Sequence, residues 1–232
     1  MNFVRQIPNV LTLLNLTFGT LAIIALGLDK VPTSLILMGG CLVADVLDGA
    51  LARKLGVAGG LGIQLDSLAD IVSFGVLPGM MIFHVGSKYS TGNPSQDLVA
   101  VAAAFCTASA GLRLARFNID TRSRKYFWGL ATPAGAMLVA GWLWAEYIDR
   151  DFGIGFSEFP WLTLIVPLFL IAAYHVPLKL PNLKSPKQGF VTAAFLVITV
   201  VIGLFTIGPI SIPMGVIAYV MLGVLNLVLK WY

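Results

Sequence analysis

The chain has 232 residues, of which 58% are hydrophobic and only 11% are charged, and its mean hydropathy is +0.89. Soluble domains carry about 25% charged residues, so this composition excludes an ordinary soluble domain and predicts an integral membrane protein. The formal net charge is +4. Basic residues that set membrane topology or contact anionic lipid account for this excess, so we predict no nucleic-acid partner.

Eight apolar segments approach the roughly 20 residues that a helix needs to cross a bilayer. They are residues 9–28, 32–53, 65–86, 98–118, 127–146, 161–176, 189–207 and 212–230. The stretches between them are too short for a soluble catalytic domain, so any chemistry must use the membrane bundle itself. We therefore predict an all-α, polytopic bundle of about eight transmembrane helices in a single membrane domain, residues 1–232.

Basic residues are distributed unequally between the two sides of this bundle. With spans alternating in direction, twelve Lys and Arg residues fall on one face of the membrane, and Lys30, Lys88 and Arg150 fall on the other. Because cytoplasmic loops are rich in Lys and Arg, the richer face is predicted to be cytoplasmic. An even number of spans then places both termini on that face of the inner, or cytoplasmic, membrane.

The second and third spans carry four aspartates, at positions 45, 48, 66 and 70. A charge at bilayer depth costs roughly 3 to 10 kcal/mol, so four of them need a compensating charge. Asp45 and Asp48 share one face of the second helix, and Asp66 and Asp70 share one face of the third. The glycine-rich segment between them suits a tight antiparallel turn, which places position 48 level with 66 and position 45 level with 70. This arrangement predicts a cage of carboxylates for one or two hard cations, Mg²⁺ or Mn²⁺.

Small and basic residues accompany the aspartates. Gly49 and Ala52 lie on the carboxylate face of the second helix, where a larger side chain would block a ligand, and Gly62 permits close backbone approach near the turn. Small residues at such spacings also serve plain helix packing. Arg53 lies beside this face at the membrane boundary, where it suits a phosphate, a pairing with an aspartate, or a snorkelling anchor.

Together these residues form the pattern Asp45-x2-Asp48-Gly49-x2-Ala52-Arg53-x8-Gly62-x3-Asp66-x3-Asp70. The pattern resembles the signature of the CDP-alcohol phosphatidyltransferase family at every defined position. The resemblance implies an integral-membrane transferase, usually a homodimer, that moves a phosphatidyl-type group from a CDP-linked lipid to an alcohol and releases CMP. It also implies a six-helix catalytic core, residues 1–180, with two additional transmembrane helices in residues 181–232.

The same resemblance implies roles for individual residues. It assigns the metal and the CDP diphosphate to Asp45, Asp48 and Asp66. It assigns the rest of the nucleotide site to Gly49, Ala52, Arg53 and Gly62. Asp70 completes the metal site and serves as the general base.

Later segments narrow the choice of acceptor. Residues 7–23, 65–79, 111–118 and 129–136 resemble the bacterial membrane-integral phosphatidylserine synthases of this family, which implies CDP-diacylglycerol and serine as substrates and a place in phospholipid biosynthesis. The expected acceptor-binding residues are Arg113, Arg116, Asn118 and Ser73. A guanidinium could hold the serine carboxylate in a two-point contact, although arginines at this end of a span also follow from topology.

Alternatives stay open at this point. The same family includes enzymes for other acceptors, such as glycerol phosphate, inositol phosphate or choline, and for ether lipids. Intramembrane prenyltransferases bind diphosphate through aspartate-rich motifs, but on separate hairpins. A divalent-cation transporter would explain four carboxylates but gives no role to Gly49, Ala52 and Arg53; substrate-dependent release of CMP separates it from a transferase.

Overall fold

The computed structural model describes residues 6–57, 59–89, 94–120, 126–148, 159–181, 204 and 208–229. These residues are almost entirely helical, as predicted. The helices are α1 (Ile7–Gly27), α2 (Val31–Lys54), α3 (Leu61–Ile71), α4 (Leu77–Tyr89), α5 (Gln96–Ile119), α6 (Thr132–Ile148), α7 (Leu162–His175) and α9 (Ser211–Leu229). A π-helix, η2 (Val72–Val76), joins α3 and α4 into one continuous rod, and a 3-10 turn, η3 (Gly208–Ile210), leads into α9.

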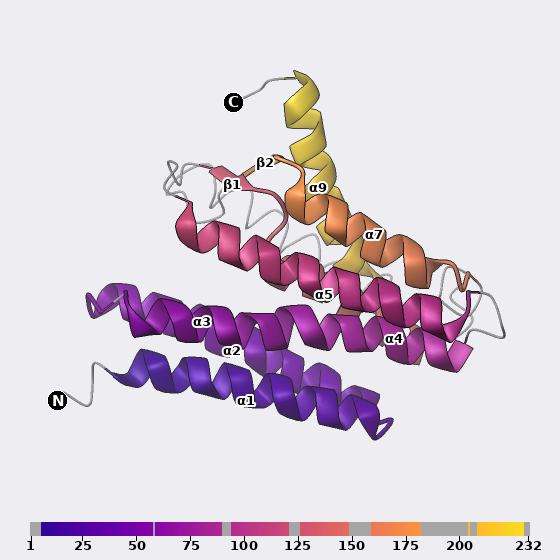
Figure 1. Cartoon of the computed structure of the whole chain (residues 1–232), viewed down its shortest axis with the longest axis horizontal. Helices are drawn as coiled ribbons and strands as arrows, with labels where there is room; N and C mark the ends of the chain where they lie inside the picture. Colours follow the sequence, from indigo (N-terminus) through magenta and orange to yellow (C-terminus); the bar gives the residue numbers. More distant parts are fainter. Residues whose placement is uncertain are drawn as a thin grey trace.

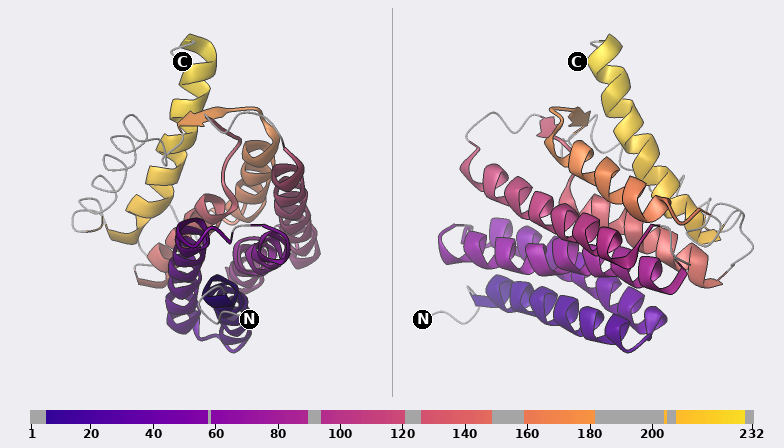
Figure 2. Two further views of the ribbon diagram at one scale, coloured as in Figure 1. Left: turned by 90° about the vertical axis from the view of Figure 1, so that its left-hand side faces the viewer. Right: turned by 45° about the vertical axis from the view of Figure 1, so that its right-hand side comes forward.

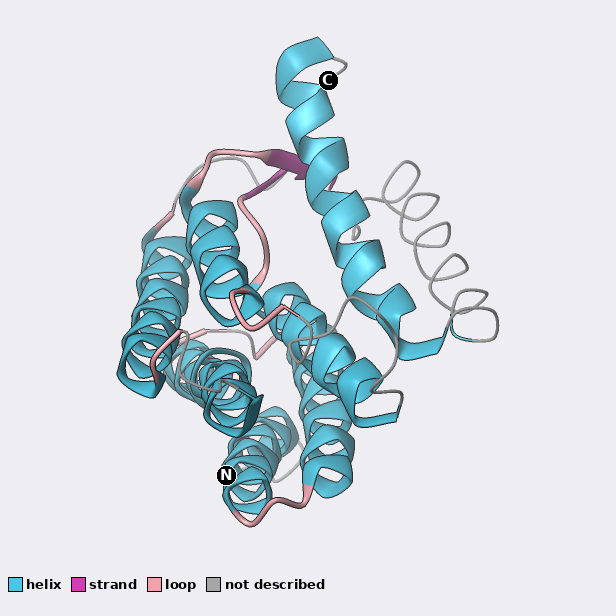
Figure 3. Ribbon diagram, turned by 90° about the vertical axis from the view of Figure 1, so that its right-hand side faces the viewer, coloured by secondary structure: helices cyan, strands magenta, loops and turns pink. Residues whose placement is uncertain are grey.

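The helices pack as a bundle with α1 to α4 on one side (Figure 1). Helix α1 packs along α2 and the α3 part of the rod, α5 packs on α4 and α7, and α6 packs on α9. Figure 2 brings α6 into view behind α5 and α7. Figure 3 looks nearly along the axes of the first helices and shows α9 crossing them steeply. The carboxylates of the second and third predicted spans therefore lie in the part of the bundle that α1 covers.

Within the described residues, five helical segments are long and apolar enough to cross a membrane. They are α1, α2, the rod (Leu61–Lys88), α5, and the segment Gly208–Leu225 that contains most of α9. Helix α7 is apolar but has only 14 residues, and α6 has 17. The predicted span 189–207 lies outside the described residues except for residue 204. A membrane-spanning bundle is confirmed, and the predicted number of about eight spans is not.

The predicted fifth span, residues 127–146, begins too early. Strand β1 (Tyr126–Trp128) pairs antiparallel with β2 (Lys179–Pro181), with Phe127 opposite Leu180. Gly129 follows with a φ of +72°, its N–H donates to the carbonyl of Leu178, and the N–H of Leu130 donates to that of Ala173. These partners lie at the end of α7, far along the chain, so the apolar pattern of residues 127–131 could not distinguish this strand from the start of a helix.

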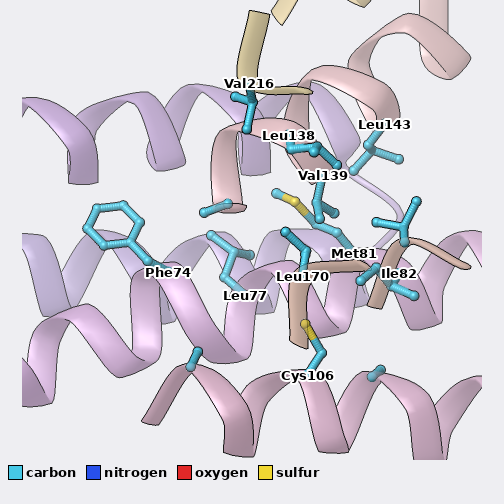
Figure 4. Close-up of a cluster of buried hydrophobic side chains, with 14 of the residues drawn as sticks. Phe74, Leu77, Met81, Ile82, Cys106, Leu138, Val139, Leu143, Leu170 and Val216 are labelled. Atoms are coloured by element: carbon cyan, nitrogen blue, oxygen red, sulfur yellow. The ribbon is translucent and has the colours of Figure 1, made fainter. Parts of the chain in front are cut away.

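Apolar side chains fill the centre of the bundle and also cover its outside. The buried cluster joins α1, α2, the rod, α5, α6, α7 and α9. Its fully buried members include Phe74, Leu77, Met81, Ile82, Leu138 and Leu170 (Figure 4). On the outer faces, Ile36 of α2 is 75% exposed and Phe105 of α5 is 65% exposed. Exposed apolar surface on this scale is unfavourable in water but not in hydrocarbon, so the outer surface suits a bilayer.

Two contacts between distant segments define the two ends of the bundle. At one end, Lys88 Nζ donates to the carboxylate of Asp29 at 2.7 and 3.0 Å, which joins the α1–α2 turn to the end of α4. At the other end, Asn118 Nδ2 donates to Ser67 Oγ at 2.6 Å, which joins the end of α5 to the start of α3. The first four spans therefore alternate in direction, as predicted, and the candidate site lies at the Ser67–Asn118 end.

Candidate active site

The carboxylate faces of α2 and α3 converge at this end of the bundle. One oxygen each from Asp45, Asp48 and Asp66 lie within 4.8 Å of one another. Asp48 is only 4% exposed, and the other two are partly buried. The turn between the helices contains Gly56, Gly59 and Gly60 at φ values of +63°, +150° and +50°, which favour glycine. The chain therefore doubles back as the glycines predict and brings the two aspartate pairs together.

This group of three carboxylates fits a divalent cation. Carboxylates at such separations repel one another when all are ionised, and a cation between them removes that repulsion. Oxygen donors are also the ligands that hard cations such as Mg²⁺, Mn²⁺ and Ca²⁺ prefer. The aspartate cluster could therefore hold a metal ion, whose identity and number stay predictions.

Asp70 lies one helical turn beyond Asp66 and is buried. The group of three close oxygens forms without it, but its charge interacts with those of Asp45 and Asp66. The amide Nδ2 of Asn15 donates to Asp70 Oδ1 at 3.5 Å. Asp70 is thus a buried carboxylate one helical turn beyond the three clustered carboxylates; its roles as a fourth ligand and as a base stay predictions.

Helix α1 supplies two residues of this site that the sequence analysis did not identify. Thr12 Oγ1 donates to Asp48 Oδ2 at 2.6 Å, and Asn15 donates to Asp70. Both side chains are buried. The signal was present in the sequence, because Asn9, Thr12 and Asn15 recur every three residues along one face of a very apolar helix.

The helix that carries Asp66 and Asp70 changes its geometry directly after them. Residues Val72–Val76 form the π-helix η2, a rare conformation that is frequent at functional sites. Ser73 lies in it fully buried, and its Oγ donates to the carbonyl of Asn15 at 3.1 Å. Thr107 Oγ1 of α5 donates to the carbonyl of Gly75 at 3.1 Å. The hydroxyl of Ser73 is thus bonded to the backbone of α1, and its proposed contact with an acceptor stays a prediction.

The residues expected to bind the nucleotide lie around the same end of α2. A Cβ at Gly49 would lie 3.3 Å from Arg53 Nη1, so the missing side chain leaves room for that guanidinium. Arg53 is exposed and Ala52 is partly buried. A Cβ at Gly62 would lie 3.4 Å from Asn9 Oδ1, which brings α1 close to the start of α3. The structure places these residues together, and their nucleotide contacts stay predictions.

Arg113 of α5 is an expected acceptor residue that is buried and whose charge acts on Asp70. It is 8% exposed, and its charge interacts with Asp70 and with the side chains of Tyr174 and Tyr219. Its Nε has no hydrogen-bond partner in the part of the chain that the structure describes. A buried guanidinium with an unpaired N–H is an unsatisfied hydrogen-bond donor in the interior of the bundle.

Arg116 and Asn118 lie farther toward the end of α5 and are exposed. Arg116 Nη1 lies 3.3 Å from His175 Nδ1, and His175 Nε2 lies 2.9 Å from Ser109 Oγ. Because an arginine can only donate, Nδ1 is the acceptor, and Nε2 carries the proton that is donated to Ser109. Of the expected acceptor residues, Arg113 and Ser73 are therefore buried, and Arg116 and Asn118 are exposed at the end of α5.

Several known proteins are similar to this chain in sequence. A Methanocaldococcus jannaschii protein named CDP-diacylglycerol–serine O-phosphatidyltransferase is 36% identical over 178 residues, which are 76% of this chain and 75% of that protein. A Helicobacter pylori protein of the same name is 31% identical over 227 residues, 94% of this chain and 90% of its own length. A Methanothermobacter thermautotrophicus protein named archaetidylserine synthase is 36% identical over 137 residues, 58% of this chain and 56% of that protein. Residues 5–172 match the CDP-alcohol phosphatidyltransferase family, and the chain therefore belongs to that family.

Proposed function

We propose that this protein is a CDP-diacylglycerol–serine O-phosphatidyltransferase, which transfers the phosphatidyl group of CDP-diacylglycerol to the hydroxyl of serine and releases CMP. The observation that carries the proposal is the convergence of three clustered carboxylates with a buried Asp70 and a buried, partly unpaired Arg113. Two relatives that carry this name align with most of the chain. Family membership favours transfer chemistry over a divalent-cation transporter.

The donor half of the site comes from α1, α2 and α3. Asp45, Asp48 and Asp66 would hold one or two Mg²⁺ or Mn²⁺ ions, and Thr12 fixes the orientation of Asp48. When bound, the cation neutralises charge on the diphosphate and on the departing CMP. The exposed guanidinium of Arg53 donates to a phosphate. Gly49, Ala52 and Gly62 leave space for the nucleotide at the water-facing end, while the acyl chains stay against the apolar outer surface.

The reaction itself needs a base, because a serine hydroxyl is a weak nucleophile at neutral pH. Asp70 accepts the hydroxyl proton as the serine oxygen attacks the phosphorus that bears diacylglycerol. The bond between that phosphorus and the CMP oxygen breaks, and CMP leaves with the electron pair. Asn15 orients Asp70 through its amide N–H. The displacement is direct and uses no covalent enzyme intermediate.

Arg113 binds the serine carboxylate in this scheme. An unsatisfied buried donor costs about 1–3 kcal/mol, and a carboxylate removes that cost at Arg113 Nε. Arg116 and Asn118 are exposed at the end of α5, where they contact the acceptor as it enters the site. Ser73 is buried one turn after Asp70 and bonded to the backbone of Asn15. In this scheme the buried Arg113 makes the specific contact with the serine carboxylate, and the exposed Arg116 and Asn118 line the path by which serine reaches it.

We place the site on the cytoplasmic face of the cytoplasmic membrane, with both termini on that side. Arg53, Lys54 and Arg116 gather at the end of the bundle where the aspartates lie, and cytoplasmic faces are the more basic ones. The family resemblance supports a homodimer.

The direct test is CMP release by the purified protein in detergent, with CDP-diacylglycerol and Mn²⁺ or Mg²⁺. Serine is compared with glycerol 3-phosphate, inositol phosphate and choline, and a CDP-activated ether lipid is the second donor because one relative is named archaetidylserine synthase. Serine-dependent release that a chelator abolishes is the expected result. CMP release with another acceptor in place of serine would contradict serine as the substrate. No CMP release with any donor and acceptor pair would contradict the proposal of a transferase.

A further inference from the structure

The side chain of Asn15 is fully buried and only half satisfied. Its Nδ2 donates to Asp70 Oδ1 at 3.5 Å, whereas its Oδ1 has no hydrogen-bond partner among the described residues. The orientation of the amide is fixed by Asp70, because exchanging the two atoms would set the amide oxygen against the carboxylate oxygen. The unpaired atom is therefore an acceptor that lies beside the proposed base.

Two side chains from neighbouring helices donate to the backbone carbonyl of Asn15 and not to its side chain. Ser73 Oγ donates to the carbonyl oxygen of Asn15 at 3.1 Å, and Cys41 Sγ lies 3.5 Å from that oxygen as a second donor. Native structures leave few buried acceptors unpaired, and each such atom needs an explanation. Since these donors are committed to the backbone, a ligand is the natural source of the donor for Oδ1.

Asp70 thus has unsatisfied groups of opposite kinds around it. Asn15 offers a buried acceptor without a donor, and Arg113 offers a buried donor without an acceptor. Asn15 donates a hydrogen bond to Asp70, and the charge of Arg113 acts on the same carboxylate. A zwitterionic amino alcohol supplies both missing partners and leaves its hydroxyl for Asp70. An anionic polyol phosphate brings no ammonium, so it cannot supply a charged donor to Asn15.

We propose that Asn15 determines acceptor specificity by accepting a hydrogen bond from the ammonium group of serine. The inference rests on the proposed function, in which Arg113 holds the carboxylate and Asp70 takes the hydroxyl proton. The surrounding carboxylates of the site reinforce the preference for a cationic donor, since an ammonium beside them is favoured electrostatically. Asn15 is then a specificity residue as well as the hydrogen-bond partner of Asp70.

The test separates these two roles by removing the ammonium from the acceptor. 3-Hydroxypropionate is serine with a hydrogen in place of the ammonium, and its inhibition constant against serine is compared with the KM for serine. Asn15→Leu keeps the size of the side chain. In this variant the inhibition constant of 3-hydroxypropionate divided by the KM for serine is expected to fall about tenfold or more, because serine loses a hydrogen bond from its charged group and the inhibitor does not. Loss of the Asp70 contact changes kcat for serine but cancels from this ratio.

A second variant and a matched control complete the experiment. Asn15→Ala is measured in parallel in case the leucine does not fit, and the folding of each variant is checked by thermal unfolding. Ser34→Ala is the control, because Ser34 Oγ is also buried without a partner but lies near the start of α2, at the other end of the bundle; its ratio should equal that of the unsubstituted protein. An unchanged ratio in both Asn15 variants would overturn the inference, whereas no serine-dependent CMP release from the unsubstituted protein would overturn the proposed function instead.

Discussion

Thr12 holds Asp48 through a 2.6 Å hydrogen bond between two buried side chains. The same hydroxyl lies 3.0 Å from the carbonyl of Pro8, one turn earlier in α1. A partner of this kind limits the rotation of a ligand carboxylate before any metal binds. The orientation of the metal site therefore depends on a helix that contributes no carboxylate to it.

Thr12→Val keeps the shape of the side chain and removes its hydroxyl. Loss of a partner behind a metal ligand typically costs about 10- to 100-fold in metal affinity or activity, so we expect the Mn²⁺ concentration for half-maximal CMP release to rise by about that factor. Thr20→Val is the control, because Thr20 Oγ1 makes the same type of helix bond, to Leu16, on the exposed face. Equal metal requirements in the two variants would exclude the role of Thr12.

Asp70→Asn tests the base. The amide cannot accept the serine proton, so turnover is expected to disappear while CDP-diacylglycerol binding, measured with labelled lipid, stays largely intact. Asp97→Asn, at the exposed start of α5, should behave like the unsubstituted protein. Full activity of Asp70→Asn would remove Asp70 as the base.

Among the elements, the rod and α5 approach each other through glycines. A Cβ at Gly79 would lie 2.5 Å from Thr107 Oγ1 and 3.2 Å from the carbonyl oxygen of Ala103. A Cβ at Gly86 would lie 2.5 Å from Val99 Cγ1. Small residues allow this close backbone approach between membrane helices. The interface sets the distance between α3, which carries Asp70, and α5, which carries Arg113.

Gly79→Ala is expected to destabilise the bundle by about 1–3 kcal/mol, the usual cost of overpacking, because one of its neighbours is backbone that cannot move aside. Gly39→Ala is the matched control, since no atom lies within 4 Å of the added methyl group and alanine favours the helix. Thermal unfolding in detergent measures both. A midpoint for Gly79→Ala as high as that of Gly39→Ala would show that the interface adapts freely.

The sequence pattern predicted those parts of the structure that depend on residues close together in the chain. The spacing of Asp45, Asp48, Asp66 and Asp70 and the glycines after Leu55 were enough for the α2–α3 hairpin and its carboxylate cluster. Strand β1 was missed because it pairs with β2, and the residues after it bond to the end of α7, both far along the chain. The partners Thr12 and Asn15 were missed because their importance depends on α1 packing across both carboxylate helices, which no single helix pattern reveals.

At the scale of the whole molecule, an ion pair connects the α1–α2 turn to the end of α4, at the end of the bundle opposite the four aspartates. Asp29 occupies a left-handed conformation with φ of +58° in the α1–α2 turn. Its carboxylate accepts from Lys88 and lies 3.3 Å from His84 Nε2. The hydrogen bond and charge of Lys88 lower the pKa of Asp29 from its ordinary value of 3.8. This cluster ties the first helical hairpin to the rod at the end opposite the site.

Stability should depend on pH through this exposed pair. Because the pKa of Asp29 is lower in the folded protein than in the unfolded chain, its contribution is present above pH 3.8 and is lost as the pH falls through the folded-state value. Asp29→Asn tolerates the same backbone conformation and should unfold at a slightly lower temperature than the unsubstituted protein at neutral pH, with the difference disappearing in acid. A difference that does not change with pH would assign the effect to the turn and not to the ion pair.

The site combines residues from separate parts of the bundle. Helices α1, α2 and α3 surround the carboxylate cluster, and in the proposed scheme Asn15 of α1 and Arg113 of α5 bind the acceptor. Helix α9, in the segment that the resemblance placed beyond the six-helix core, brings the buried Tyr219 close enough to interact with Arg113. A C-terminal helix of the chain therefore contributes to the surroundings of the acceptor arginine.

The π-helix between Asp70 and Gly79 lets the rod hold one residue more than a regular α-helix would hold in the same space. Removing one residue from Val72–Val76 would return the rod to a regular α-helix without turning the part beyond it, so Gly79 and Gly86 would still face α5. The change would be confined to the π-helix, where the hydroxyl of Ser73 and the carbonyl of Gly75 would lose their present hydrogen-bond partners. A family member that lacks the extra residue should accordingly keep the helix packing and differ in the contacts directly after Asp70.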